Sequence, residues 1–223
     1  NAQTYAATAG NTLKVNAGAA TTFTSTADTI TFGNAGNANG GTLLLADGSN
    51  LNVNSANGVI NAFAGIRGNS AEIVSLNAGT STLSVGQIGS GDEVASVALT
   101  AATTTLRGNI TTADAVGNNV SITGAVTLAG NVAIDTSRTT NKGDITITGA
   151  STGAGIGLTL TGGVISTGAI TTTGAANGDG GAVSITGSGT VAVGAITATG
   201  GAASGTANGR NAGAVGITGA GVT

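Results

Sequence analysis

Leu51-Asn52-Val53-Asn54 recurs along the chain as Val74-Ser75-Leu76-Asn77, as Val97-Ala98-Leu99-Thr100 and as Val120-Ser121-Ile122-Thr123. In each copy two apolar residues alternate with small or polar ones, which is the period-two pattern of a short β-strand. The step from each copy to the next is the same all three times, about 23 residues. A fixed period of this length predicts a solenoid, in which every repeat adds one coil to a stack.

The pattern continues on both sides of this region, and a second element accompanies it. We assign Ile30-Thr31-Phe32, Ile145-Thr146-Ile147, Val183-Ser184-Ile185 and Val215-Gly216-Ile217 to the same strand in other coils. The second element, Gly-x-Ile or Gly-x-Val, follows the first at a nearly constant distance and ends at Ile88, Ile110, Val132 and Ile196. Leu158-Thr159-Leu160 also fits the first strand, so the spacing leaves open whether Ile145 or Leu158 opens its rung.

The length of the repeat varies at one corner. The return from the second element to the next first strand is shortest between Ile88 and Val97 and longest between Ile196 and Val215. Stacked coils tolerate such insertions because the walls stay in register while a loop bulges outward. We therefore predict an N-terminal cap or first irregular rung over residues 1–29, and solenoid rungs over 30–223 with longer corner loops after residues 170 and 196.

Composition indicates a thin core. Glycine accounts for 41 of 223 residues and aromatic residues for only 2%, so the large side chains that fill a spherical core are almost missing. Hydrophobic residues still make up 40% of the chain, which favours folding over disorder. The predicted fold class is all-β, a parallel β-helix solenoid with rungs of about 23 residues and no helix.

Several classes of chemistry lack the residues they need. The chain contains no Cys, His, Met, Trp or Pro, which excludes disulfides, thiolate or imidazole metal sites and histidine acid–base catalysis. A net charge of −3 with six scattered cations gives no basic surface for nucleic acid. No apolar run approaches about 18 residues, so we expect no membrane-spanning helix. We assign no catalytic, metal-binding or cofactor-binding residue.

The acidic residues raise the alternative of a carbohydrate-active enzyme, because many β-helices are such enzymes and use two or three converging carboxylates. The nine acids are Asp28, Asp47, Glu72, Asp92, Glu93, Asp114, Asp135, Asp144 and Asp179. Four sites among them, at Glu72, Asp92 with Glu93, Asp114 and Asp135, recur about once per rung near one corner. We interpret them as solvated loop residues, and Asp179 as part of a loop that does not match the calcium-binding nonapeptide frame.

Threonine runs raise the alternative of an ice-binding solenoid. Thr103-Thr104-Thr105, Thr111-Thr112, Thr171-Thr172-Thr173 and Thr197-Ala198-Thr199 would place hydroxyl and methyl groups on regular faces. The runs do not fall at one fixed distance from the first strand, so the sequence predicts that the outward threonines form no single flat array.

The later repeats resemble those of filamentous-haemagglutinin-type exoproteins and autotransporter passengers. The resemblance rests on Val-x-Ile-Thr-Gly, Gly-Ala-Ile-Thr and Gly/Asn-rich loops within residues 168–187 and 194–219, and covers residues 51–223. It implies a right-handed β-helix that is exported across the outer membrane of a Gram-negative bacterium. The Asn-Pro-Asn motifs of that family's secretion domain are missing, which suggests shaft rather than secretion signal.

The sequence as a whole favours a structural or adhesive role over catalysis. We expect a shaft segment of a large secreted bacterial cell-surface protein or extracellular filament, found outside the cell and without enzymatic activity. Because residues 215–223 stop within a rung, we expect either a longer rod or an end that another copy covers. The expected partners are other copies of the chain, joined end to end, and host or matrix glycans or proteins.

Overall fold

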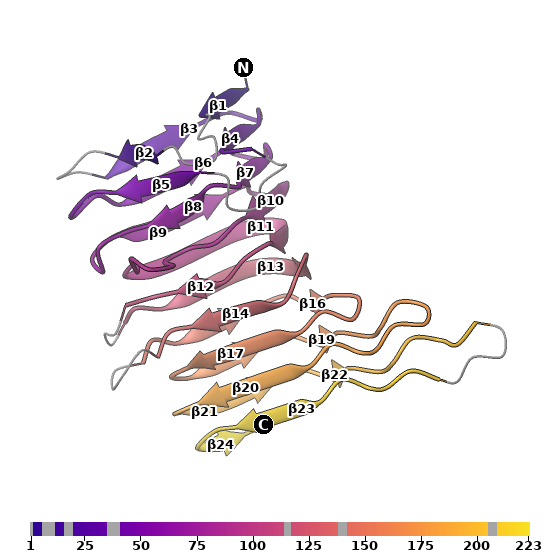
Figure 1. Cartoon of the computed structure of the whole chain (residues 1–223). Coiled ribbons are helices and arrows are strands. Elements are labelled where there is room, and N and C mark those ends of the chain that lie inside the picture. The colour runs from indigo at the N-terminus through magenta and orange to yellow at the C-terminus, as the bar shows by residue number, and fades with distance from the viewer. Residues whose placement is uncertain are drawn as a thin grey trace.

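The chain folds into a stack of parallel strands that run around three walls (Figure 1). The computed structural model describes residues 2–5, 12–15, 20–34, 41–113, 117–137, 142–204 and 209–223. Within these residues there are strands and no helices, and every strand pair is parallel. The predicted fold class, an all-β parallel solenoid, is therefore confirmed.

The first wall stacks nine strands or half-strands in order. They are β1 (Gln3–Tyr5), β4 (Ile30–Phe32), β7 (Ile60–Ala62), β10 (Thr82–Val85), the ends of β11 (Ser96–Leu106) and β13 (Val120–Leu128), β16 (Ser151–Thr152), β19 (Ile170–Thr171) and β22 (Ile196–Thr197).

The second wall consists of two stacks joined by single bridges from Ile88 to Ile66 and to Ile110. Its strands are β2 (Thr12–Val15), β5 (Thr42–Leu45), β8 (Gly65–Arg67), β12 (Ile110–Thr111), β14 (Val132–Asp135), β17 (Leu158–Gly162), β20 (Val183–Gly187) and β23 (Val215–Thr218).

The third wall closes the coil. It contains β3 (Thr21–Thr24), β6 (Leu51–Asn54), β9 (Ile73–Asn77), the beginnings of β11 and β13, β15 (Ile145–Ile147), β18 (Ile165–Thr167), β21 (Thr190–Val193) and β24 (Gly221–Val222). One strand from each wall makes a rung, except that the fourth rung has only the bridging residue Ile88 on the second wall, and the described segments make nine rungs.

The strict repeat between Leu51 and Thr123 is one column of the third wall. Leu51 pairs with Val74, Val74 with Val97, and Val97 with Val120, so the constant step in sequence is one full coil. All four side chains are at most 1% exposed, so the alternating pattern correctly predicts which residues face the core. The column continues through Ile145, Ile165, Val191 and Val222.

The assignment of Ile145 to this column is confirmed, whereas that of Ile30, Val183 and Val215 is wrong. Leu158, Val183 and Val215 pair with one another on the second wall, whereas Ile30 lies on the first wall. Ile145 and Leu158 therefore do not compete for one position, because they start strands on different walls. The physical reason is that an inward apolar residue, an outward residue and a second inward residue suit any wall of the coil.

The second repeated element is divided in the same way. Ile88 and Ile110 pair on the second wall, as predicted, but Ile110 pairs with Ile134, so Val132 lies two residues before the position equivalent to Ile110. Ile170 and Ile196 pair with each other on the first wall, so their Gly-Ala-Ile motifs mark a different corner.

Inward columns of Val, Ile and Leu fill the narrow core, and most of these side chains are at most 2% exposed. The aromatic residues gather near the N-terminal rungs, where Tyr5 stacks on Phe32 with ring centroids 5.2 Å apart. Phe23 lies edge-on to both rings. The described strands β1, β2 and β3 pair with β4, β5 and β6, so they continue the three walls.

Two buried hydroxyl groups face this apolar core without a hydrogen-bond partner among the described residues. They are Thr104 Oγ1 and Ser151 Oγ, and both residues pair with Val126, which lies between them in the first wall. A buried hydroxyl without a partner loses its hydration and gains nothing in return.

Replacing Thr104 with valine should therefore raise the free energy of unfolding by about 1 kcal/mol, because the shape is kept and the unpaired hydroxyl is removed. Chemical denaturation would measure the change. Thr105→Val is the matched control, since Thr105 lies on the outer surface of the same strand and should change stability little. Equal effects of the two substitutions would contradict the assignment of Thr104 Oγ1 as a buried hydroxyl group without a hydrogen-bond partner.

Candidate functional site

Two of the acidic residues outside the Glu72 corner bind backbone amides of the next rung, and a third binds within its own turn. Asp144 Oδ1 accepts a hydrogen bond from Val164 N at 2.8 Å, and Asp179 Oδ1 accepts one from Asn211 N at 3.1 Å. Asp135 Oδ1 accepts from the backbone and hydroxyl of Ser137. Within the described ranges no group of three or more acidic residues is arranged to hold a metal ion. Asp114 lies outside the described residues.

Glu72 is the exception to the interpretation of the acids as solvated loop residues. Its side chain is fully buried, and Oε1 accepts a hydrogen bond from Gly48 N at 3.0 Å. Oε2 accepts from Asn69 N and, at 3.3 Å, from Ala71 N. The carboxylate thus accepts the hydrogen bonds that water would otherwise accept from three backbone amides at the corner between the second and third walls. The prediction that Glu72 is a solvated loop residue is wrong.

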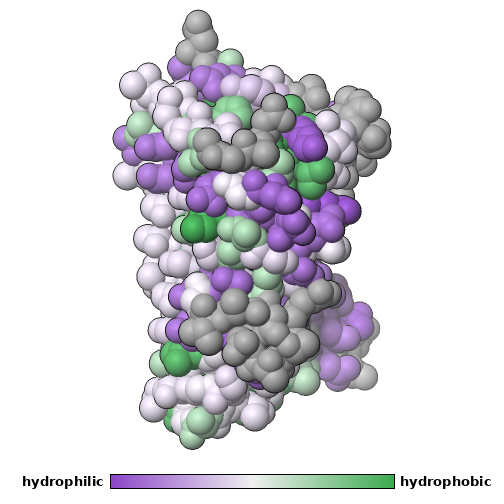
Figure 2. Space-filling model, turned by 90° about the vertical axis from the view of Figure 1, so that its left-hand side faces the viewer, coloured by the Kyte–Doolittle hydropathy of each residue, from purple (hydrophilic) through white to green (hydrophobic). Residues whose placement is uncertain are grey.

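Charged groups around Glu72 remain at the surface. Arg67 and Asp92 form an ion pair of 3.8 Å, with side chains 44% and 55% exposed. Asn69 Nδ2 donates to Asp47 Oδ1 at 2.7 Å. The side of the molecule drawn in Figure 2 shows hydrophilic side chains over its upper half and hydrophobic ones only singly. This corner is a solvated polar surface over one buried carboxylate.

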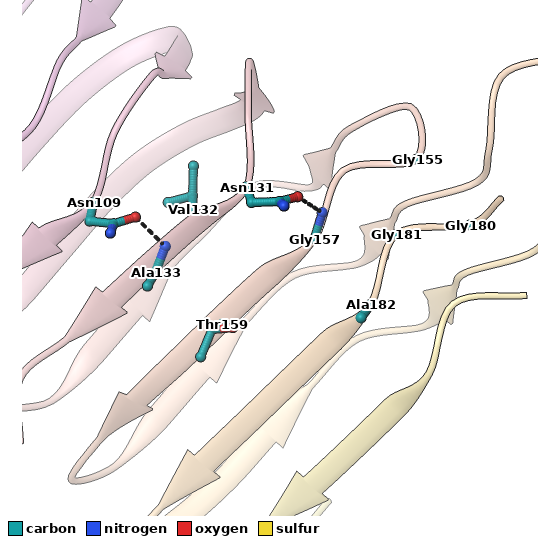
Figure 3. A pocket seen from close by; sticks show the side chains of 10 residues that line it. All are labelled: Asn109, Asn131, Val132, Ala133, Gly155, Gly157, Thr159, Gly180, Gly181 and Ala182. Carbon is teal, nitrogen blue, oxygen red and sulfur yellow. Dashed lines mark hydrogen bonds between the residues drawn. The ribbon is translucent and has the colours of Figure 1, made fainter. Parts of the chain in front are cut away.

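Asparagine side chains join successive rungs at two corners. Asn109 Oδ1 accepts from Ala133 N at 2.9 Å, and Asn131 Oδ1 accepts from Gly157 N at 2.8 Å (Figure 3). On another corner Asn119 Oδ1 accepts from Asp144 N at 2.7 Å. Each bond links residues 24 to 26 apart in sequence, so each amide fixes one rung to the next.

The equivalent asparagines of the third wall act differently. Asn54 and Asn77 pair in register, as the repeat predicts. Each Oδ1 atom accepts a hydrogen bond from the backbone two residues ahead, at Ala56 N and Gly79 N. These are turn contacts within a rung, which is the turn chemistry expected of asparagine after a strand.

A groove runs along the corner between the first and second walls (Figure 3). Its volume is about 480 Å³. The lining residues are Asn109, Asn131, Val132, Ala133, Gly155, Gly157, Thr159, Gly180, Gly181 and Ala182. None of them is charged, and none was singled out as a site residue by the sequence.

Glycine-rich loops form the outer side of this groove. The connections that follow β16, β19 and β22 leave the stack on the same side and become longer from rung to rung (Figure 1). They hydrogen-bond to one another, for example through Gly155 N to Thr173 O at 3.0 Å and Gly174 N to Thr199 O at 2.9 Å. We call the described residues 153–157, 172–182, 198–204 and 209–214 the fin.

The fin needs glycine because its backbones lie in contact. A Cβ atom on Gly201 would lie 1.8 Å from Ala175 O, and one on Gly181 would lie 2.2 Å from Ile156 O. No side chain fits at such distances without moving the backbone. The glycine-rich composition of these loops thus has a structural cause that the sequence did not reveal.

A second regular surface lies on the outside of the first wall. Its central column is Thr4, Thr31, Asn61, Ser84, Thr105, Thr127, Thr152, Thr171 and Thr197, and none of these residues is buried. The expectation that outward threonines form no single array is wrong. The expectation failed because it measured the position of each threonine from a strand that lies on the third wall. The threonines belong to the first wall and occupy the same position in each of its strands.

The flanking positions in the last five rungs are almost as uniform. On one side they are Thr103, Ala125, Ala150, Ala169 and Ala195, and on the other Arg107, Ala129, Ala154, Thr173 and Thr199. Thr173 and Thr199 share a hydrogen bond of 3.2 Å between their hydroxyl groups. In the four rungs that follow the rung of Arg107, this surface therefore presents only small methyl and hydroxyl groups.

Comparison with known proteins adds no assignment. No family model matches the chain, and the searches of curated proteins and of solved structures likewise found no match. Within the described residues no helix is long and apolar enough to cross a membrane. The resemblance to filamentous-haemagglutinin-type repeats thus rests on the repeat residues alone.

Proposed function

We propose that this chain is a structural and adhesive shaft segment of a secreted bacterial cell-surface protein or extracellular filament. The observation that carries the proposal is the parallel pairing of rungs on three walls, continued on the second wall by the single bridges of Ile88, around a core only a few side chains wide. Nine rungs at about 4.8 Å each correspond to a rod on the order of 40 Å long. Such a stack can hold binding loops or further domains away from a surface.

Contacts between rungs support a load-bearing role. Backbone hydrogen bonds run along the rod axis, and the side-chain amides of Asn109 and Asn131 at one corner and of Asn119 at another add bonds between rungs. In a solenoid each rung contacts only its neighbours, so stability depends on these interfaces.

The last described rung would accept a further rung. Val215 and Val222 are 49% and 52% exposed, whereas their partners in the preceding rung, Val183 and Val191, are at most 1% exposed. A strand placed on β23 and β24 would bury both valines and extend the backbone pairing. That strand could belong to the same polypeptide or to another copy.

Single-molecule pulling between the two ends tests the shaft proposal. We expect the chain to unfold in several steps, each releasing about one rung, because neighbouring rungs are held by similar interfaces. Substituting Asn109, Asn119 and Asn131 together by alanine should lower the unfolding force. Release of the whole chain in one low-force event would contradict the proposal.

The threonine surface of the first wall favours a second candidate function, binding to ice. Five consecutive rungs place a threonine at the same outward position, at the spacing of about 4.8 Å that backbone pairing sets. This spacing is close to the basal repeat of hexagonal ice. Neighbouring methyl groups restrict water around the hydroxyls, so ordered water can bridge the surface to the crystal.

Ice binding predicts thermal hysteresis and faceted ice crystals in solutions of the chain. Thr127→Tyr or Thr171→Tyr should abolish both effects, because a ring would project from the flat surface. Ser121→Tyr is the matched control, since Ser121 faces outward on the third wall. Unshaped crystals with the unmodified chain would exclude this function while leaving the shaft proposal intact.

A further inference from the structure

Arg107 lies on the outer surface of the first wall, and two contacts hold its guanidinium in place. Nε donates a hydrogen bond to Ser84 Oγ at 2.8 Å, and Cζ lies 5.3 Å from the centre of the Phe63 ring. Phe63, Gly86 and Arg107 directly follow β7, β10 and β11, so they occupy equivalent positions in three successive rungs. Because Gly86 has no side chain, that of Arg107 can cross this rung and reach the ring.

This guanidinium is a cation on an otherwise neutral face. The described strands of the first wall contain no charged residue. Within the described part of the chain no acid forms an ion pair with Arg107, whereas Arg67 is paired with Asp92. Arg107 is exposed, and its terminal nitrogens donate to no other described residue. Their N–H groups can therefore donate to a ligand.

The two contacts make Arg107 a better anion site than an ordinary surface arginine. Exposed ion pairs usually contribute little, partly because forming them orders two long side chains. The hydrogen bond to Ser84 and the contact with Phe63 order the arginine before any ligand binds, which lowers that cost. The terminal nitrogens form a fork that matches two oxygens of one acidic group.

Neutral polar side chains lie beside the guanidinium on the same face. Asn61, Ser84 and Thr105 occupy the central outward position in the three rungs that the Arg107 side chain spans, and none of them is buried. Amide and hydroxyl groups both donate to and accept from sugar hydroxyls. A ligand that carries an acidic group among several hydroxyls, as a uronic acid or a sulfated sugar does, suits this combination.

We propose that Arg107 binds the acidic group, carboxylate or sulfate, of an anionic polysaccharide, while the column of Asn61, Ser84 and Thr105 contacts the hydroxyls of its sugars. This inference rests on the proposed adhesive role and names the ligand class of that role. It involves binding alone, with no chemical step.

Isothermal titration with hexagalacturonate and with a sulfated hexasaccharide tests the inference, and maltohexaose is the neutral comparison. We expect at least one acidic hexamer to bind, and the one that binds identifies the acidic group. Maltohexaose should bind about tenfold more weakly or not at all, because it cannot form the charge-assisted hydrogen bonds. Arg107→Gln should weaken binding of the acidic hexamer by about the same factor.

Arg107→Lys keeps the charge but loses the fork, so its affinity should lie between those of the unmodified chain and Arg107→Gln. A lysine side chain can still cover Phe63, so this variant decides the matter if Arg107→Gln fails to fold. Thermal unfolding of each variant reports whether it folds.

Arg67→Gln is the matched control, because it removes the same charge from an exposed arginine that is already paired with Asp92 on another wall. It should leave binding unchanged. If neither acidic hexamer binds, if maltohexaose binds as tightly, or if the Arg67 and Arg107 variants lose binding equally, the inference is overturned. Stepwise unfolding under force would still support the shaft, so the two proposals fail separately.

Discussion

Replacing Gly124 with alanine should lower the free energy of unfolding by about 3 kcal/mol or more, as expected for a strained backbone that also clashes. Gly124 lies where β13 turns from the third wall to the first and has a φ of 105°. An added Cβ would lie 1.9 Å from Ala101 O in the preceding rung. Ala101 O belongs to the backbone of a strand that pairs with β13. The clash can therefore be relieved only by breaking backbone hydrogen bonds between the two strands.

Gly216→Ala provides the comparison for this experiment. Gly216 is also in a strand, but it has an ordinary φ, and a Cβ there meets nothing within 4 Å. Chemical denaturation should show a change within about 0.5 kcal/mol for this control. Similar losses at both positions would contradict the assignment of the effect to the corner geometry, because the lower entropy of the unfolded chain favours alanine at both.

Glu72→Ala is expected to destabilise the chain by on the order of 3 kcal/mol, since buried amides that lose a charged acceptor remain unsatisfied. The substitution removes the acceptor from Gly48 N, Asn69 N and Ala71 N at once. Hydrogen exchange should show faster exchange at these three amides than elsewhere in the same rungs.

Asp92→Ala tests whether charge alone explains that loss. Asp92 lies at the same corner, but its ion pair with Arg67 is about half exposed. Exposed pairs contribute little, so this variant should lose less than about 1 kcal/mol. A loss as large as that of Glu72→Ala would contradict the assignment of Glu72 as a buried acceptor for backbone amides.

The sequence predicted the core of the fold well where the period is strict. Between Leu51 and Val120 a constant step places equivalent residues directly above one another. Beyond Ile145 the strand pattern remained clear but its wall did not, because all walls bury the same kinds of side chain. Only pairing in three dimensions separates Val183 from the column of Val120.

The candidate site could not be predicted in the same way. The Gly-Asn-Ile and Gly-Asn-Val motifs at Asn109 and Asn131 indicated a strand start, and the amide bonds they make depend on rungs 24 to 26 residues away. Glu72 resembled the other loop acids because all of them recur about once per rung near one corner. Its burial results from a turn of the preceding rung at Gly48.

Engineered disulfides test the register on which every proposal depends, and the chain has no cysteine to interfere. Ser121 pairs with Thr146 across the third wall, whereas Thr159 lies on the second wall. Ser121→Cys combined with Thr146→Cys should oxidise readily, because adjacent paired strands meet the distance requirement of a disulfide. Ser121→Cys with Thr159→Cys should stay reduced, and the reverse outcome would contradict the three-walled coil.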